Sequence, residues 1–141
     1  MNGKAFLDTN VLLYAYSVDD EEKRGIGMQL LQAGESATSV QTLNEFCNVC
    51  LKKLKLNREI ILRSIKTILS ICEIYSVTAA TIQLALLLQE RYHYAYYDCI
   101  MLASALENGC TKIYTEDMSS GQMIEDQLLI INPFEIAEGS T

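Results

Sequence analysis

Four acidic residues stand at or inside segments that are otherwise apolar. With their settings, they are Asp8 in AFLDTNVLLYAY, Glu45 in SVQTLNEFCNV, Asp98 in YYDCIMLASAL and Asp117 in KIYTEDMSSGQ. An unpaired carboxylate is costly to bury, so each acid must be exposed, paired or used. Four carboxylates in one cleft would raise one another's pKa, and a divalent cation would remove that repulsion. Because all-oxygen ligands suit Mg²⁺ or Mn²⁺, the pattern indicates a metal site.

Each acid also has an ordinary structural explanation when it is taken alone. Aspartate is a favoured N-cap, which would account for Asp8 and Asp98. Thr42 and Glu45 have the spacing of a capping box, in which Glu45 would only satisfy a backbone N–H. Asp117 could belong to a turn with the serines and glycine that follow it. A shared metal site therefore requires that the four acids converge in the fold.

Strands and helices are expected to alternate along the chain. Strands are expected at 4–9, 36–39, 73–77, 111–115 and 128–131, helices at 19–34, 40–53, 58–72, 79–92 and 98–108, and a helix or apolar turn at 11–16. This alternation predicts βαβ units, hence a three-layer α/β/α fold. We expect a central parallel sheet of four to five strands in the order 3-2-1-4-5.

The expected sheet would bring the acids together. In open parallel sheets, ligands bind beyond the carboxyl ends of the strands, where the strand order reverses. Asp8 follows the first strand and Asp117 the fourth, and these strands are neighbours in the expected order. Helices that begin near Val40 and Asp98 could direct Glu45 and Asp98 into the same cleft.

Composition indicates one intracellular domain. The 141 residues include a single proline, and we find no linker, repeat or low-complexity tract, so we expect one domain over 1–135 and a short tail at 136–141. No apolar run approaches the roughly 18 residues of a membrane span, and polar residues interrupt the first apolar segment. Five scattered cysteines fit reduced thiols, including the Cys47-x-x-Cys50 pair. We therefore expect a cytoplasmic protein without a membrane segment.

The charge of the chain is unevenly distributed. The net charge of −7 argues against a protein that coats nucleic acid electrostatically. Residues 52–66 nevertheless hold six basic residues and one acid: Lys52, Lys53, Lys55, Arg58, Arg63, Lys66 and Glu59. A solvated helix face is the ordinary explanation of such a run.

These segments resemble the PIN-domain family, which includes the VapC-type toxins of bacterial toxin–antitoxin pairs. The resemblance runs over residues 5–134 and is most specific in LDTN and in TEDM followed by an apolar strand and NPF. It implies that the expected domain is a PIN domain whose catalytic and metal-binding acids are Asp8, Glu45, Asp98 and Asp117. It also implies that Asn10 and Thr115 support those ligands. Glu116 is a rival to its neighbour Asp117, and Ser119 stands where some members carry a further acid.

The resemblance further implies an endoribonuclease that uses Mg²⁺ or Mn²⁺ to activate water against an RNA phosphodiester bond. Glu45 would be a ligand or would orient the attacking water. The basic residues Lys52, Lys53, Lys55 and Arg58 become candidate RNA contacts. Four tyrosines could stack on bases, although packing is the commoner role: Tyr92, Tyr94, Tyr96 and Tyr97. A cognate antitoxin and a homodimer, formed through apolar helices such as 79–92, are the implied protein partners.

Two alternatives remain open. The chain could be a non-catalytic PIN module that only binds RNA or a partner protein, and metal-dependent cleavage would distinguish the two. A haloacid-dehalogenase-type phosphatase also begins with a strand that ends in aspartate. That family requires a second aspartate two residues later, where this chain has Asn10, so it ranks below the PIN reading.

Overall fold

The structure is a computed structural model and describes residues 3–135. Its elements are β1 (Lys4–Leu7), α1 (Thr9–Ala15), α2 (Glu21–Leu31), β2 (Ser36–Ser39), α3 (Val40–Lys52), α4 (Arg58–Ile71), β3 (Glu73–Tyr75), α5 (Ala79–Tyr92), α6 (Tyr96–Glu107), β4 (Cys110–Tyr114), β5 (Met123–Ile124) and β6 (Leu128–Ile131). The tail expected at 136–141 lies outside the described residues. No described helix is long and apolar enough to cross a membrane.

The sheet has the expected α/β topology with one strand added. Its order is β3-β2-β1-β4-β6-β5, and the first five of these strands are parallel. The last expected strand, 128–131, is β6, so the order 3-2-1-4-5 is confirmed for the parallel strands. β5 pairs antiparallel with β6 at the edge and makes the six-stranded sheet mixed. Its two residues are too short to leave a periodic sequence signal.

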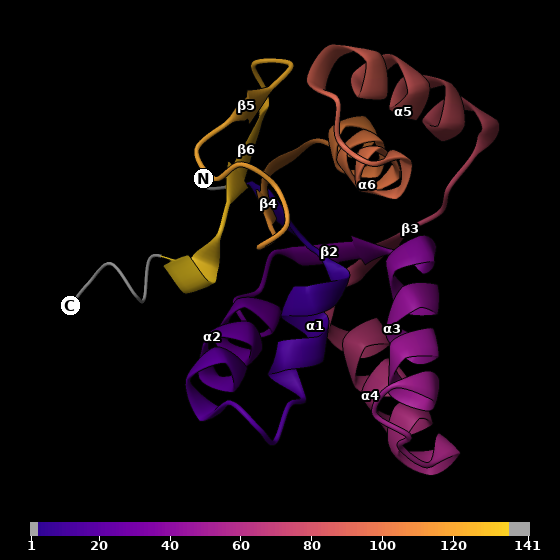
Figure 1. The fold of residues 1–141 in the computed structure, drawn as a ribbon, viewed down its shortest axis with the longest axis vertical. Helices are drawn as coiled ribbons and strands as arrows, with labels where there is room; N and C mark the ends of the chain where they lie inside the picture. The colour runs from indigo at the N-terminus through magenta and orange to yellow at the C-terminus, as the bar shows by residue number, and fades with distance from the viewer. Residues whose placement is uncertain (1–2, 136–141) are drawn as a thin grey trace.

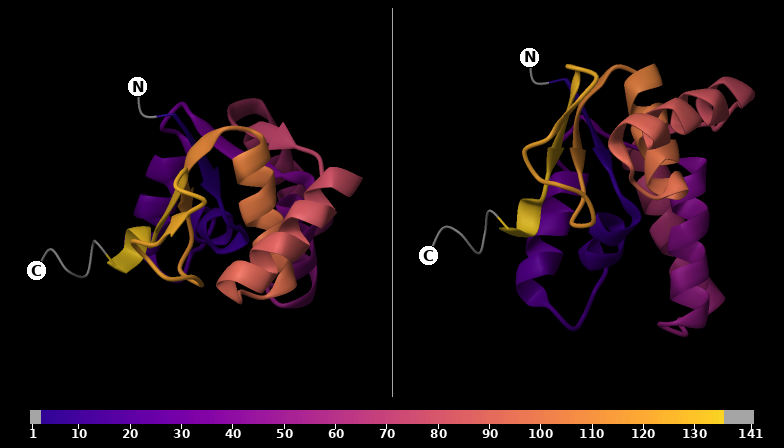
Figure 2. Two further views of the ribbon diagram at one scale, coloured as in Figure 1. Left: turned by 90° about the horizontal axis from the view of Figure 1, so that it is seen from above. Right: turned by 45° about the horizontal axis from the view of Figure 1, so that its top comes forward.

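Helices cover both faces of the sheet, because neighbouring residues of a strand point to opposite sides. Phe6 packs into one core with α5, α6 and the later strands, whereas Leu7 packs into a second core with α1 to α4. Figure 1 shows α5 and α6 together on one side and α1 to α4 on the other, and Figure 2 shows the same pairing from two further directions. The three-layer arrangement is therefore confirmed.

The two N-terminal helices approach each other closely. A side chain added at Gly27 of α2 would place its Cβ 2.9 Å from the Ala15 nitrogen and 2.9 Å from the Val11 oxygen of α1. Those atoms belong to the backbone and cannot swing aside, so only glycine fits at this contact. The register of α2 on α1 is fixed by backbone contact at this point.

Candidate metal centre

Asp8 combines a structural role with a position at the carboxyl end of β1. It is the N-cap of α1, and its Oδ1 accepts a hydrogen bond from the backbone N–H of Thr9, the first residue of that helix. Its Oδ2 accepts a second hydrogen bond, 2.6 Å long, from the Thr115 hydroxyl beyond β4. The residue is only 3% exposed. A cap needs only one oxygen, so the second oxygen joins the ends of two neighbouring strands.

Asp117 lies beside Asp8 on the segment that follows β4. The Thr115 Oγ1 that donates to Asp8 also accepts from the Asp117 backbone N–H at 3.1 Å. The Asn10 Nδ2 donates to the Asp117 Oδ2 at 2.7 Å. Asn10 and Thr115 therefore contact the acids that they were expected to support.

Glu116 points the other way. Its Oε1 accepts from the Tyr14 hydroxyl at 2.9 Å, and its Oε2 lies 3.4 Å from the Lys23 ammonium. The Lys23 Nζ lies 4.5 Å from the Tyr14 ring centroid and 5.3 Å from that of Phe134. The sequence could not decide between Glu116 and Asp117, and these contacts favour Asp117 as the acid that faces Asp8.

Glu45 reaches the same end of the sheet from α3. The Thr9 hydroxyl lies 3.2 Å from its Oε2, and Gln41 Nε2 lies 3.4 Å from its Oε1. The capping-box explanation for Glu45 is wrong, because the N-cap of α3 is Ser39 and Thr42 lies inside the helix. Thr9 is a contact that the sequence analysis missed, although its place between Asp8 and Asn10 was a usable signal.

Asp98 lies in the first turn of α6 and is half-buried. The helix begins at Tyr96, two residues before the expected start, and its N-cap is Ala95, which makes no side-chain capping bond. The capping explanation for Asp98 is therefore wrong. Asp98 is joined to the other acids by charge rather than by a hydrogen bond, since its pKa is raised by burial and then by Asp117 and Glu45.

Electrostatics link the four carboxylates into one cluster, which we call the acid cluster (Asp8, Glu45, Asp98 and Asp117). Burial raises the pKa of Asp8 to about 6, and the charges of Asp117 and Asp98 add to the rise, against the hydrogen bonds from Thr115 and Thr9. Partial loss of hydration raises the pKa of Asp117, and Glu116 adds to it. Like charges therefore face one another in the acid cluster. Among the described residues, no lysine or arginine contributes to these pKa shifts.

The acid cluster suits a hard divalent cation in its donor chemistry. All its ligand atoms are carboxylate oxygens, and three of its four members carry a raised pKa that a cation would reverse. Within residues 3–135, however, no three acids, cysteines or histidines lie close enough to hold one ion directly. Mg²⁺ keeps several waters when bound and can be held through them, so the donor set fits such an ion.

The expected RNA contacts lie apart from the acid cluster. Lys52 and Lys53 end α3, Lys55 lies in the turn and Arg58 begins α4, and all four are exposed. Lys52 is seven residues beyond Glu45 on one helix, which corresponds to a separation of about 10 Å along its axis. Figure 1 shows this hairpin projecting away from the sheet. The structure therefore places the basic residues at the turn of the α3–α4 hairpin, outside the acid cluster.

Two of the four tyrosines have structural partners. The Tyr92 hydroxyl donates to Glu125 at 2.9 Å, and the Tyr94 hydroxyl donates to Gln122. Both bonds anchor the segment after β4 to the end of α5. Tyr97 remains 60% exposed beside Asp98 and packs edge-on against Tyr96.

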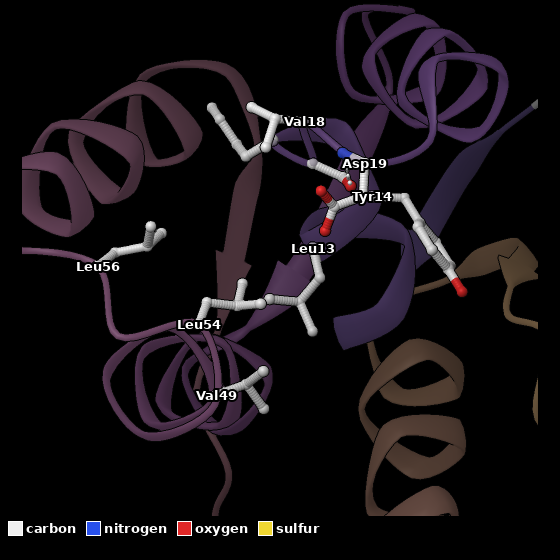
Figure 3. Close-up of a pocket in the computed structure, with 9 residues that line it drawn as sticks. Leu13, Tyr14, Val18, Asp19, Val49, Leu54 and Leu56 are labelled. Carbon is white, nitrogen blue, oxygen red and sulfur yellow. Dashed lines mark hydrogen bonds between the residues drawn. The ribbon is translucent and has the colours of Figure 1, made fainter.

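An apolar pocket that the sequence analysis did not anticipate lies between α1 and the α3–α4 hairpin. Its volume is about 300 Å³, and Leu13, Val49 and Leu54 contribute to its lining. Figure 3 shows Leu13 and Leu54 pointing toward one another across it. None of the acid cluster lines this pocket, so it is separate from the candidate metal centre.

Comparison with known proteins identifies the fold family. A family model described as the PIN domain matches residues 5–119. Similar solved structures include a toxin–antitoxin complex from Klebsiella pneumoniae, with 23% identity over 92% of this chain and 98% of that chain and a TM-score of 0.69. VapC20 of Mycobacterium tuberculosis, a sarcin–ricin-loop-cleaving toxin, shares 18% identity over 81% of this chain and 90% of that chain, with a TM-score of 0.66.

VapBC2 from Rickettsia felis, bound to a DNA fragment from its promoter, shares 17% identity over 91% of this chain and 98% of that chain, with a TM-score of 0.63. No curated protein matches the chain. At these identities the structural likeness establishes the fold, and the family follows from the model match. Because that match covers most of the chain, from the first strand through the segment that carries Asp117, the protein belongs to the PIN domain family.

Proposed function

We propose that this protein is an endoribonuclease that depends on Mg²⁺ or Mn²⁺. The observation that carries the proposal is the acid cluster itself, in which burial and neighbouring carboxylates raise the pKa of Asp8 and of Asp98 at the carboxyl end of the sheet. Such a cluster is costly without a cation, and strongly perturbed groups gathered in one place are typical of functional sites. The expected catalytic and metal-binding residues are Asp8, Glu45, Asp98 and Asp117.

The chain's own residues would hold and orient these ligands. A bound cation would lower the pKa of a water molecule and neutralise charge on the scissile phosphate. Thr115 donates to Asp8 and Asn10 donates to Asp117, so both side chains fix carboxylate orientations. Thr9 and Gln41 hold the Glu45 carboxylate in the same way. Glu45 would then be a ligand or would orient the attacking water.

The proposal also includes an RNA substrate and two kinds of protein partner. Lys52, Lys53, Lys55 and Arg58 would attract an RNA strand to the α3–α4 hairpin, beside the repelling acid cluster. Toxin–antitoxin complexes among the similar structures support a cognate antitoxin as a protein partner. The exposed Ile82, Leu86 and Leu87 of α5 support a homodimer through that helix.

Cleavage of mixed RNA by the purified protein tests the proposal, with Mg²⁺, Mn²⁺ or EDTA in parallel. We expect products only with a cation, and none from Asp98→Asn, which removes one charge at nearly constant size. Glu73→Gln is the matched control, because Glu73 is an exposed acid that pairs with Lys4. Retained RNA binding without cation-dependent cleavage would instead support the non-catalytic module.

A further inference from the structure

Asp117, an acid of the proposed centre, is carried by irregular chain. Residues 115–122 lie between β4 and β5, where no sheet pairing by Asp117 itself fixes its backbone. Its position beside Asp8 rests on the Thr115 hydroxyl and on Asn10. Both of these neighbours act on the side of the segment that faces the acids. The position of the Asp117 carboxylate therefore also depends on the contacts that hold the rest of this segment.

The far end of the segment has its own anchors. Met118 is buried in the core beneath α5 and α6. The Ser119 backbone N–H donates to the Tyr94 hydroxyl at 3.1 Å. At the near end, the Thr115 N–H continues the pairing toward β6 by donating to the Ile131 carbonyl at 3.0 Å. Between these anchors only Glu116 and Asp117 remain.

Glu116 ties this remaining part to α1 and α2 through what we call the Glu116 latch (Tyr14, Lys23 and Glu116). Tyr14 donates to Glu116 at 2.9 Å, and Lys23 lies within 3.4 Å of both the Glu116 Oε2 and the Tyr14 hydroxyl. The Lys23 ammonium also lies over the Tyr14 and Phe134 rings, which meet edge-on with centroids 4.9 Å apart. The Lys23 ammonium is therefore paired with Glu116 and also held in place by the two rings.

We propose that Glu116 is a positioning residue, which Tyr14 and Lys23 hold so that the adjoining Asp117 carboxylate stays beside Asp8 for a shared cation. The inference rests on the proposed metal-dependent function and adds residues that the acid cluster does not contain. Partners that orient metal ligands typically change metal affinity 10- to 100-fold when removed. Misplacing a ligand by about 1 Å can cost a comparable factor in rate.

A simple charge effect makes the opposite prediction for Lys23. Lys23→Met removes no carboxylate and takes away one positive charge near the acid cluster. If Lys23 acted only through its field, a divalent cation would bind more tightly in the variant. If Lys23 acts through the latch, the segment loosens and the cation binds more weakly. The sign of the change therefore separates the two explanations.

Titration of Mn²⁺ into the metal-free protein without RNA, by calorimetry, measures this sign. We expect Lys23→Met to raise the Mn²⁺ Kd roughly 10-fold. Tyr14→Phe, which changes no charge, should raise it several-fold, and Lys23→Arg should stay within about threefold of the parent, because arginine can keep the ion pair. Lys4→Met is the matched control: it breaks the exposed Lys4–Glu73 pair of 2.8 Å and should leave the Mn²⁺ Kd unchanged.

Unaltered or tighter Mn²⁺ binding by both Lys23→Met and Tyr14→Phe, with melting temperatures in EDTA near that of the parent, would overturn the inference. The milder Tyr14→Phe keeps the test decisive if Lys23→Met does not fold. A parent that binds Mn²⁺ but cleaves no RNA would overturn the proposed nuclease activity and leave the positioning result standing. A parent that binds no Mn²⁺ would overturn both.

Discussion

The acid cluster and Glu125 have opposite surroundings. In the acid cluster, Asp8 is buried among like charges and its pKa is raised to about 6. At the turn between β5 and β6, Glu125 receives a hydrogen bond from Tyr92 and pairs with Arg91, and these contacts lower its pKa. Glu125 is satisfied by the protein alone, whereas the acid cluster is not. The cation that we propose for the acid cluster would remove this difference.

The largest expected effect is on RNA cleavage. Asp8→Asn, Glu45→Gln, Asp98→Asn and Asp117→Asn should each reduce the cleavage rate in Mg²⁺ by roughly 100-fold or more, because each removes a proposed ligand charge. Glu125→Gln, made in the same background, should stay within about twofold of the parent, since its partners already satisfy it. Initial rates on one RNA substrate check the comparison. An equal loss of cleavage rate in Glu125→Gln and in the acid-cluster variants would contradict the difference between Glu125 and the acid cluster.

A second effect concerns stabilisation by the cation. A ligand that binds only the folded protein at about 100 times its Kd stabilises it by about 2.7 kcal/mol. For a domain of this size, we expect Mn²⁺ to raise the melting temperature by several degrees in the parent and in Glu125→Gln. The Asp8→Asn and Asp98→Asn variants should show little of this shift in melts with Mn²⁺ and with EDTA. An equal shift in all four proteins would mean that the acid cluster does not bind the ion.

The acid cluster and Glu125 should also respond oppositely to pH. The Asp8 pKa of about 6 exceeds its ordinary value, so the stability linked to its protonated form is present at low pH and lost as the pH rises through about 6. The metal-free parent should therefore gain stability between pH 7.5 and 5, by an amount on the order of 1 kcal/mol. The pKa of Glu125 is lowered, so its contribution is lost only as the pH falls below the ordinary glutamate range.

Denaturant melts in EDTA at a series of pH values measure this difference. In Asp8→Asn the gain toward pH 5 should shrink markedly, because the titrating carboxyl is gone. Glu125→Gln should leave the gain intact. A parent whose stability falls steadily from pH 7.5 to 5 would contradict the raised pKa of Asp8.

The smallest expected effect is on the stability conferred by Glu125 itself. Its Arg91 partner is half exposed, and exposed ion pairs typically contribute only about 0.2–1 kcal/mol. Glu125→Gln should therefore lower the melting temperature by no more than a few degrees at pH 7. High salt should reduce the difference between variant and parent, because it screens the pair. A large loss of stability would mean that the turn is a structural support in its own right.

The sequence was sufficient for the parts of the fold that follow from regular patterns. Alternating strands and helices predicted the parallel strand order, and that order predicted that the segments bearing Asp8 and Asp117 would be neighbours. Helix ends were less certain, because several residues near each boundary can cap. Ser39 caps the helix that carries Glu45, and the helix that carries Asp98 starts at Tyr96.

The sequence could not reveal contacts that depend on tertiary packing. Glu116 and Asp117 are adjacent acids with the same local pattern, and only the course of the segment turns one toward Asp8 and the other toward Tyr14. Lys23 reaches Glu116 across 93 positions of the chain. No local signal marks that pairing, since it exists only when α2 lies against α1. The metal-binding and catalytic roles of the acid cluster remain predictions.

The close backbone contact at Gly27 gives α2 a function beyond packing. Lys23 lies one helical turn before Gly27, so the two residues share the helix face that meets α1. Any side chain at Gly27 would push α2 away from α1 and carry the Lys23 ammonium with it. The absence of a side chain at Gly27 therefore sets the distance between α2 and α1, and with it the position of Lys23. In a stability screen, a substitution at Gly27 would resemble an ordinary packing defect. By displacing Lys23, it would also loosen the segment that carries Asp117.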